Sequence, residues 1–271
     1  MVLFNLLDPT GVLLFGLPLM KVAIVGMGPQ GRRLVQVIKG HPGLELAAVC
    51  DLRADALEHA DLAGLPALRS TSLAEVLAVP GLDMLCITTS GPSHRDIAIQ
   101  AMEAGVRRVF VEKPMGCSLE TCDQMIAVAK RTGTRLVVNQ SRRHEPFYRW
   151  LREKIATGEW GQLRSIWIQR AGIGLGCLGT HFFDLVRWVS GQEVTAVTAW
   201  VDDFIGPSPR GAQFVDPGGM VVMQMSGGAR AVISQIEDGA GPMSVEIDLT
   251  QARIKIDEHV GKFEILERDM S

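Results

Sequence analysis

The sequence predicts an α/β protein in which a doubly wound parallel sheet is followed by a smaller α+β domain with a mainly antiparallel sheet. Short apolar runs alternate with helical segments up to about residue 140, and strand-like runs dominate after that point. The 271 residues, 47% of them hydrophobic and 21% charged, suffice for one large domain or two modest ones with buried cores. The change of pattern near residue 140 favours two domains.

The first predicted domain contains strands that are covered on both faces, because its apolar runs are rich in β-branched residues and lack polar alternation. Ser72 and Glu75 form a capping-box pattern at a helix start, and Gly105 and Gly133 stand where glycines end helices. Strands that alternate with helices over short connections form parallel sheets. The strands predicted here are 21–25, 44–50, 83–88, 106–111 and 135–139.

The second predicted domain has few helices and many strands. Two helices are expected at 146–157 and 181–190, each stopped by a glycine, Gly158 or Gly191. Ser226–Gly228 is predicted to be a hairpin turn, and the Pro- and Gly-rich stretch 206–219 is expected to be a loop. The strands predicted in this domain are 163–171, 194–201, 220–225, 229–236, 243–249, 253–259 and 263–268.

Three segments follow from these patterns: an apolar arm at 1–19, a doubly wound α/β domain at 20–140 and an α+β domain at 141–271. The first twenty residues contain no Lys or Arg and no small-residue cleavage site, so we do not expect a secretory signal there. Their apolar stretch is also far shorter than the ~20 residues that span a bilayer. A cytoplasmic protein without membrane contact is therefore expected.

The overall composition excludes several classes of partner. Lys and Arg number 27 against 30 Asp and Glu, so the net charge of −3 argues against nucleic acid. Five cysteines without a CxxC pair, and histidines without ligand spacing, argue against a disulfide framework and a metal site. Because two helices cannot cover both faces of the second sheet, we expect a homodimer or homotetramer packed through that sheet.

A glycine-rich turn follows the first strand. Gly26, Gly28 and Gly31 form G-x-G-x-x-G, with Pro29 and Gln30 between the last two and a helical segment after them. The first glycine permits the tight turn, the second lets a pyrophosphate approach the backbone, and the third lets the helix pack on the strand. The helix N-terminus presents free amides to the phosphates. This is the signature of a Rossmann-type dinucleotide-binding domain.

The second strand ends at Asp51, twenty positions beyond Gly31. A carboxylate there accepts hydrogen bonds from the adenosine ribose and repels a 2′-phosphate, which favours NAD over NADP. Arg53 weakens this inference, because a nearby guanidinium could hold such a phosphate.

Lys113 stands between a strand and Pro114. A residue before proline is pushed into extended geometry, so we expect Lys113 to continue the strand and project at its carboxyl end. Ligands bind at that edge of open α/β sheets, where the amine could donate or accept a proton. Without further context, a solvated strand-end lysine is the more common case.

Six segments identify the broader pattern. They follow in the order KVAIVGMGPQG, AAVCD, CITTSGPSHRDIAIQAMEAG, VFVEKPMG, NQSRRHEP and GTHFFDLVRWVSG, spread over roughly residues 20 to 200. In this combination the chain resembles the Gfo/Idh/MocA family, the relatives of glucose–fructose oxidoreductase and inositol dehydrogenase. The resemblance implies NAD(P)-dependent hydride transfer between a nicotinamide cofactor and a sugar, polyol or sugar-derivative hydroxyl or ketone.

The resemblance also implies roles for individual residues. Lys113 and His181 correspond to the family's proton-transfer residues, and Arg143 falls where the family often has an arginine near the substrate. Cys177 and Thr180, which precede His181, are expected in the same substrate site. The cofactor contacts implied by the remaining motifs are Thr89, Ser90 and His94, with Glu112 beside the nicotinamide ribose.

His181 begins an apolar helical segment, with Asp184 and Trp188 on the same helix face. Glycines at 172, 174, 176 and 179 precede it, so the segment could lie against a ligand, although without the resemblance a packed helix-start histidine is the more common case. The family commonly has an aspartate four residues before this histidine, where this chain has Cys177. A neutral thiol orients an imidazole, and stabilises its protonated form, less well than a carboxylate does.

Two other functions remain compatible with the sequence. Some relatives use bound NAD transiently to cleave glycosidic bonds, so net hydride transfer would be undetectable. Alternatively, Cys177 is consistent with a non-catalytic NAD(H)-binding regulator. A glycoside assay without added cofactor distinguishes the first, and tight cofactor binding without turnover distinguishes the second.

Overall fold

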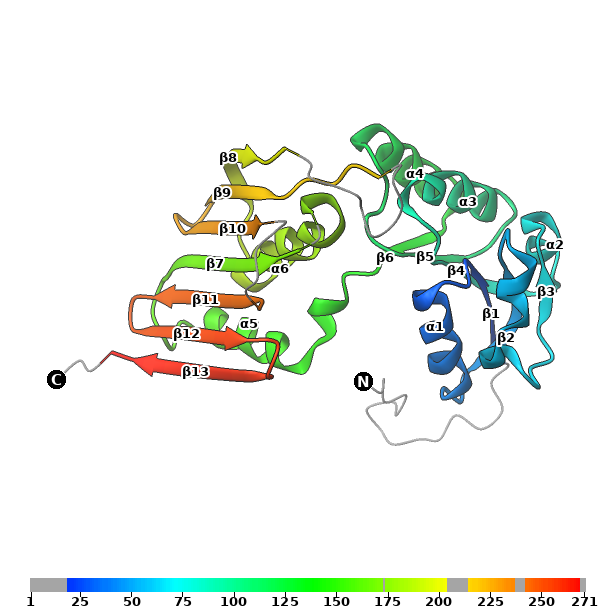
Figure 1. Cartoon of the computed structure of the whole chain (residues 1–271), viewed down its shortest axis with the longest axis horizontal. Coiled ribbons are helices and arrows are strands. Elements are labelled where there is room, and N and C mark those ends of the chain that lie inside the picture. Colours follow the sequence, from blue (N-terminus) through cyan, green and yellow to red (C-terminus); the bar gives the residue numbers. More distant parts are fainter. Residues whose placement is uncertain (1–18, 173, 204–213, 237–241, 269–271) are drawn as a thin grey trace. The chain divides into compact units, whose positions relative to one another are not determined.

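The computed structural model describes residues 19–172, 174–203, 214–236 and 242–268, which form two compact units (Figure 1). One unit contains the described residues up to Asn139, and the other contains those from Gln140 onward. Residues 1–18 of the predicted arm and 206–213 of the predicted loop lie outside the described residues. Within the described ranges, no helix combines the length and hydropathy that crossing a bilayer requires.

The first unit is built on a six-stranded parallel sheet with the order β3-β2-β1-β4-β5-β6, which confirms the doubly wound architecture (Figure 1). Its strands are β1 (Met20–Val25), β2 (Leu44–Cys50), β3 (Leu68–Ser70), β4 (Leu82–Ile87), β5 (Arg108–Val111) and β6 (Arg135–Val138). Its helices are α1 (Pro29–Lys39), α2 (Leu73–Leu77), α3 (Gly91–Glu103) and α4 (Leu119–Thr132), with two short 3-10 turns, η1 (Ala54–Glu58) and η2 (Ala60–Leu62).

Both faces of this sheet are buried, each in its own core. On one face Ala23 and Val25 of β1 pack with α2, α3 and α4, and on the other Val22 and Ile24 pack with α1 and η1. Successive side chains of a strand point to opposite faces, so an uninterrupted apolar run is what such a strand requires. The absence of polar alternation in the sequence is thereby explained.

The predicted elements differ from the observed ones in a few places. Val106 lies outside β5, because its amide donates to the carbonyl of Ala101 and closes the end of α3. The three-residue edge strand β3 was not predicted, since it lacks an apolar run. The capping box of α2 is half formed. The Ser72 hydroxyl accepts a hydrogen bond from the Glu75 amide, but the Glu75 carboxylate accepts from the Ser70 hydroxyl and not from the Ser72 amide.

The second unit is built on a seven-stranded sheet with the order β13-β12-β11-β7-β10-β9-β8. Its neighbours are antiparallel except β7 and β10, which run parallel. Its strands are β7 (Leu163–Ala171), β8 (Val194–Val201), β9 (Gly219–Met225), β10 (Arg230–Ile236), β11 (Ser244–Leu249), β12 (Ala252–Asp257) and β13 (Lys262–Glu267). Its helices are α5 (Pro146–Thr157) and α6 (Thr180–Ser190), with the turns η3 (Ser141–His144) and η4 (Leu175–Gly179).

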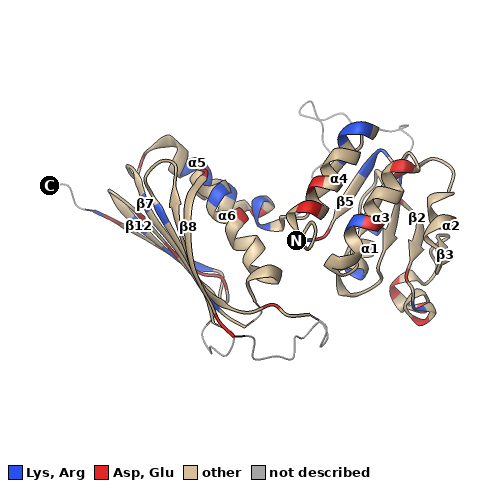
Figure 2. Ribbon diagram, turned by 90° about the horizontal axis from the view of Figure 1, so that it is seen from above, with Lys and Arg blue, Asp and Glu red and all other residues tan. Residues whose placement is uncertain are grey.

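The helices α5 and α6 cover one face of this sheet (Figure 2). Phe182 and Leu151 are buried with Ile166, Ile168 and other strand residues. As predicted, glycines with positive φ end both helices, and the 226–228 turn joins β9 to β10. The element bounds agree with the sequence to within about two residues, because alternation and glycine punctuation are both strong here.

Candidate active site

The turn between β1 and α1 has the shape of a phosphate-binding turn. Gly26 has a φ of +98°, and a Cβ there would lie 2.8 Å from the backbone of Thr88 and Thr89. A Cβ on Gly31 would lie 2.0 Å from the carbonyl oxygen of Gly26. Gly28 differs, because beyond its chain neighbours no atom lies within 4 Å of where its Cβ would be. The space over Gly28 therefore lets a ligand approach the backbone.

Helix α1 begins at this turn with Pro29 in its first position, which presets the helical φ. The first amide with an acceptor in the helix is that of Arg32, which donates to the Gly28 carbonyl at 3.0 Å. The amides of Gln30 and Gly31 have no acceptor within the helix. Together with the positive end of the helix dipole, they are suited to bind phosphate.

Asp51, which follows β2, is fixed beside the glycine turn. One carboxylate oxygen accepts from the Met27 amide at 2.7 Å, and the other accepts from the Arg53 amide at 2.9 Å. The Arg53 side chain is 66% exposed and lies 3.8 Å from Asp51. The end of β2 thus carries a fixed carboxylate and an exposed guanidinium.

The loop after β4 lies next to the glycine turn, because β4 pairs with β1. These two strands lead to helices on opposite faces, which makes this the switch point where doubly wound sheets bind ligands. The Thr88 hydroxyl donates to the Gly26 carbonyl, Thr89 accepts from Ser93 at 2.7 Å, and Ser90 is exposed at the start of α3.

His94 occupies a different position from the one expected for a cofactor contact. Its side chain is 0% exposed, with Nδ1 lying 2.8 Å from the Pro114 carbonyl and Nε2 lying 3.1 Å from the Thr89 carbonyl. A side chain without exposed surface cannot contact a cofactor, so that expectation is corrected. His94 instead ties the loop after β4 to the loop after β5.

Glu112 and Lys113 follow β5, the neighbour of β4. Glu112 is buried, and its Oε1 accepts from Asn139 at 2.7 Å. Lys113 is half-buried, and its bond to Pro114 is cis. The expectation that the strand continues through Lys113 is wrong, because β5 ends at Val111 and Pro114 has no amide to extend the ladder. Lys113 nevertheless lies at the carboxyl edge of the sheet.

His181 lies in the first turn of α6, directly after the short π-helical turn η4. Cys177 is buried within η4, and the Thr180 hydroxyl donates to the Cys177 carbonyl at 3.2 Å. Single π-helical turns are rare and frequently lie at functional sites. The three predicted residues Cys177, Thr180 and His181 are therefore grouped at one helix start.

Arg143 contacts the same helix. Its Nε donates to Asp184 at 2.7 Å, and its Nη2 donates to the other oxygen of that carboxylate. Hydrogen bonding to Asp184 is the main reason that the pKa of Arg143 is raised above its ordinary value. The bidentate pair joins the segment before α5 to α6, one turn beyond His181. Sequence spacing placed Asp184 on the His181 face without showing this partner.

A residue that the sequence did not single out holds η4. Asp216 lies before β9 and accepts hydrogen bonds from the amides of Gly176 at 2.6 Å and Cys177 at 2.8 Å. A Cβ on Gly174 would lie 1.7 Å from the Asp216 carbonyl oxygen. Of the four glycines predicted to lie against a ligand, Gly174 and Gly176 face Asp216, Gly179 faces Gln235, and no described atom beyond its chain neighbours lies within 4 Å of a Cβ on Gly172. The only indication of Asp216 in the sequence is the pair Gly174 and Gly176, because closely spaced glycines suggest that another part of the chain or a ligand approaches the backbone.

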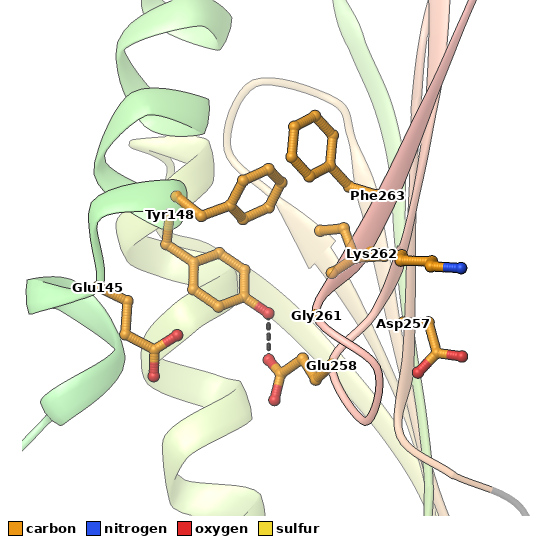
Figure 3. Close-up of a pocket in the computed structure, with 9 residues that line it drawn as sticks. Glu145, Tyr148, Asp257, Glu258, Gly261, Lys262 and Phe263 are labelled. Atoms are coloured by element: carbon orange, nitrogen blue, oxygen red, sulfur yellow. Dashed lines mark hydrogen bonds between the residues drawn. The ribbon is translucent and has the colours of Figure 1, made fainter. Parts of the chain in front are cut away.

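A pocket of about 340 Å³ lies between the start of α5 and the β12–β13 turn (Figure 3). The Tyr148 hydroxyl points from α5 to Glu258 and donates to its carboxylate. Burial, followed by the Glu258 charge, raises the Tyr148 pKa. Arg142 donates to the same carboxylate oxygen. None of the residues predicted for catalysis or cofactor binding lines this pocket. Tyr148, the single tyrosine of the chain, needed a partner once buried.

The structure therefore groups the predicted residues in two sets. Those for the cofactor, together with Lys113, lie in the unit up to Asn139, whereas Arg143, Cys177, Thr180 and His181 lie in the unit from Gln140. A parallel sheet with a phosphate-binding turn at its switch point, followed by a mainly antiparallel sheet domain, defines a two-domain dinucleotide-binding protein.

Sequence comparison gives the family. Residues 20–140 match "Oxidoreductase family, NAD-binding Rossmann fold", and residues 167–255 match the "GFO/IDH/MocA C-terminal domain". The chain belongs to the Gfo/Idh/MocA family of NAD-binding oxidoreductases.

Curated relatives extend this comparison. Inositol 2-dehydrogenase 3 of Saccharopolyspora erythraea is 30% identical over 192 residues, 65% of this chain and 55% of that protein. The scyllo-inositol 2-dehydrogenase (NAD(+)) of Bacillus subtilis is 30% identical over 196 residues, 66% of this chain and 56% of that protein. The chain thus spans little more than half the length of these relatives.

A solved structure shares the fold. The WlbA dehydrogenase from Bordetella pertussis in complex with NADH and UDP-GlcNAcA superposes with a TM-score of 0.83 at 21% identity, covering 94% of this chain and 79% of that one.

Proposed function

We propose that the chain is an NAD-dependent dehydrogenase or reductase that acts on a CH–OH group, or the matching ketone, of a polyol, sugar or sugar derivative. The observation that carries the proposal is the carboxyl edge of the parallel sheet. There the glycine turn, Asp51 and Lys113 follow three strands, β1, β2 and β5. The relatives named as inositol 2-dehydrogenases support a polyol-like substrate.

The residues of the first unit fit NAD. The open space over Gly28 accepts a pyrophosphate, and the fixed Asp51 carboxylate accepts hydrogen bonds from ribose hydroxyls. That carboxylate also repels a 2′-phosphate, whereas the exposed Arg53 attracts one. We assign the stronger effect to Asp51, because its carboxylate is held in place by two amides. Residues 20–140 accordingly form the cofactor domain, and residues 141–271 form the substrate and oligomerisation domain.

The mechanism assigns proton transfer to two side chains. NAD, when bound, supplies the acceptor for the hydride that leaves the substrate C–H bond. Lys113 Nζ hydrogen-bonds the substrate oxygen and takes its proton in the oxidative direction, sharing this task with His181. We place Arg143, Cys177 and Thr180 in the substrate site through their position around the start of α6.

The test is a panel of inositols, other polyols and nucleotide sugars assayed with NAD and NADP in parallel, read by NADH absorbance. We expect NAD-dependent turnover of at least one member and slower turnover with NADP. Cleavage of a chromogenic glycoside without net NADH would instead indicate NAD-dependent glycosidase chemistry. Tight NAD binding without any turnover would indicate a regulator. Either result overturns the proposal.

We also propose a cytoplasmic location. Cys50, Cys86, Cys117 and Cys122 are free thiols, and the chain folds into two units with substantial cores. Reduced cysteines are typical of proteins from a reducing compartment.

A homodimer or homotetramer is proposed from the sheet face opposite α5 and α6. Along β7, Trp167 points to that face and is 51% exposed, while its neighbours Ile166 and Ile168 are buried under the helices. Strand pairing places Val232 and Val222 in the same row as Trp167, and Trp200 beside Met220 in another row. An exposed apolar area of the kind that Trp167, Met220 and Trp200 form marks an interface.

The other half of the same face limits the geometry. On β11, β12 and β13 the row of Trp167 continues with Glu246, Lys255 and Glu264, which alternate in charge. A two-fold contact between two copies is therefore centred on the neighbouring strands β7, β10, β9 and β8. The charged strands β11, β12 and β13 lie at its rim. Light scattering of wild type and Trp167→Asp tests this: a dimer that the variant weakens is expected, and a wild-type monomer at micromolar concentration contradicts it.

A further inference from the structure

The family aspartate that precedes the catalytic histidine is replaced by Cys177, and a carboxylate from elsewhere in the chain reaches the same turn. Both oxygens of Asp216 are used, Oδ1 by the Gly176 amide at 2.6 Å and Oδ2 by the Cys177 amide at 2.8 Å. The next residue continues the contact, since the Leu175 amide donates to the Pro217 carbonyl at 3.0 Å. Three successive amides of η4 are thus bound by residues 216 and 217.

These amides lie at the start of the helical segment formed by η4 and α6. The first amides of a helix have no acceptor within it, and an anion there is favoured by the helix dipole. Asp216 therefore caps the segment from a position about forty residues further along the chain. Hydrogen bonds to a charged acceptor are about twice as strong as neutral ones.

The glycines of η4 fit this carboxylate closely. Gly174 has a φ of −64°, which any residue adopts, so its backbone does not require glycine. The contact does, because a Cβ on Gly174 would lie 1.7 Å from the Asp216 carbonyl oxygen, and one on Gly176 would lie 2.9 Å from Asp216 Oδ1. On the other side, the fully buried Gln235 donates to the Gly174 carbonyl at 3.0 Å.

We infer that Asp216 is the positioning residue of this catalytic centre: its carboxylate fixes η4, and thereby the start of α6 with His181. The inference rests on the proposed function, because it gives Asp216 a purpose only if His181 takes part in proton transfer. Asp216 acts through the backbone of Gly176 and Cys177 and not on the substrate itself.

The experiment compares Asp216→Asn, Cys177→Asp and the double variant with wild type. Asparagine has one amide oxygen, so it satisfies only one of the two amides and places a donor against the other. We expect Asp216→Asn to lower kcat by about ten- to a hundredfold, the range of effects from small misplacements of catalytic groups, with NAD affinity unchanged. Asp203→Asn, an exposed carboxylate of the connection between β8 and β9, is the matched control.

Moving the carboxylate from position 216 to position 177 tests whether Asp216 acts through the amides of η4 or through its charge alone. Cys177→Asp in wild type places a second carboxylate beside Asp216, and like charges oppose each other's ionisation, so no gain in kcat is expected. In the Asp216→Asn background, a carboxylate on residue 177 cannot replace the acceptor of the Gly176 amide and of its own amide, so no recovery of kcat is expected. A double variant that recovers wild-type kcat overturns the inference, as does wild-type kcat in Asp216→Asn.

A readout without turnover keeps the test independent of the proposed function. Amide hydrogen exchange of residues 175–177 is expected to quicken in Asp216→Asn and to stay unchanged in Asp203→Asn. Unchanged exchange overturns the inference whatever the substrate panel shows. Quickened exchange would confirm that Asp216 holds the amides of η4. If the wild type then turned over no substrate, the proposed function would be refuted, and with it the catalytic purpose of Asp216.

Discussion

Two glycine-rich turns, one in each unit, look alike in sequence and differ in what fills them. In the turn at Gly26–Gly31, beyond the chain neighbours of Gly28, no protein atom lies within 4 Å of where a Cβ on that glycine would be. In the turn before His181, the space over Gly174 is occupied by the backbone of Asp216. Glycine therefore admits a ligand in the first turn and another segment of the chain in the second.

The difference teaches that a run of glycines indicates close approach without indicating what approaches. The first turn is completed by neighbouring strands, since Asp51 and Thr88 follow β2 and β4 and bond to the Met27 amide and the Gly26 carbonyl. The second turn depends on a contact that is distant in sequence. Substitutions in the two turns should accordingly separate cofactor binding from stability and turnover.

The largest effect is expected outside both turns. If the first turn only holds the cofactor, chemistry can be removed without weakening binding. Lys113→Met is expected to lower kcat by ~10²–10⁴-fold, the usual contribution of general acid–base catalysis, while NAD affinity stays unchanged. Steady-state kinetics and calorimetric titration measure both quantities, with the exposed Lys130→Met as control. Near wild-type turnover in Lys113→Met would show that the chemistry lies elsewhere.

Within the first turn, two alanine substitutions should act differently. Gly28→Ala meets no protein atom, so unfolding of the cofactor-free protein should not change, but NAD affinity should fall by about ten- to a hundredfold. Gly31→Ala meets the Gly26 carbonyl at 2.0 Å and should destabilise the cofactor-free protein by about 1–3 kcal/mol. The comparison fails if Gly28→Ala binds NAD as wild type does.

The second turn should show the opposite behaviour. Gly174→Ala has an allowed backbone but meets the Asp216 carbonyl, so we expect a loss of about 1–3 kcal/mol in the free energy of unfolding. NAD affinity should be unaffected, because the cofactor is bound by the other unit. Urea unfolding and calorimetric titration provide the readouts. A neutral substitution would mean that Asp216 does not occupy this space in solution.

The smallest effect concerns the choice of dinucleotide. Asp51→Ala removes both the attraction for ribose hydroxyls and the repulsion of a 2′-phosphate. We expect the ratio of NADP to NAD dissociation constants to narrow by about tenfold, as the loss of one charged hydrogen bond of about 1.5 kcal/mol implies. Arg53→Ala should widen the ratio. If the wild-type protein bound NADP at least as tightly as NAD, Arg53 and not Asp51 would determine the cofactor preference.

The first unit could be predicted from the sequence because its signals are local. Apolar runs mark strands buried on both faces, and the spacing from Gly31 to Asp51 marks a complete strand–helix–strand unit. The misses have local causes too. β3 is too short to show a pattern, and the amide of Val106 serves the end of α3 instead of β5.

The candidate residues of the second unit could be predicted only in part. His181, Cys177 and Thr180 are close in sequence and remain together at the start of α6. Asp216 and the Arg143–Asp184 pair depend on tertiary contacts that no periodicity encodes. His94 shows the same limit, since its position in the motif does not reveal that it is fully buried.

Amide hydrogen exchange with and without NAD tests the difference between the two turns most directly. NAD should protect the amides of residues 26–31 and 51–53, because phosphate binding occupies the donors at the start of α1 and ribose binding fixes Asp51. Residues 175–177 should exchange equally in both states, since Pro217 and Asp216 already accept hydrogen bonds from their amides. Protection at 175–177 without protection at 26–31 would contradict the account.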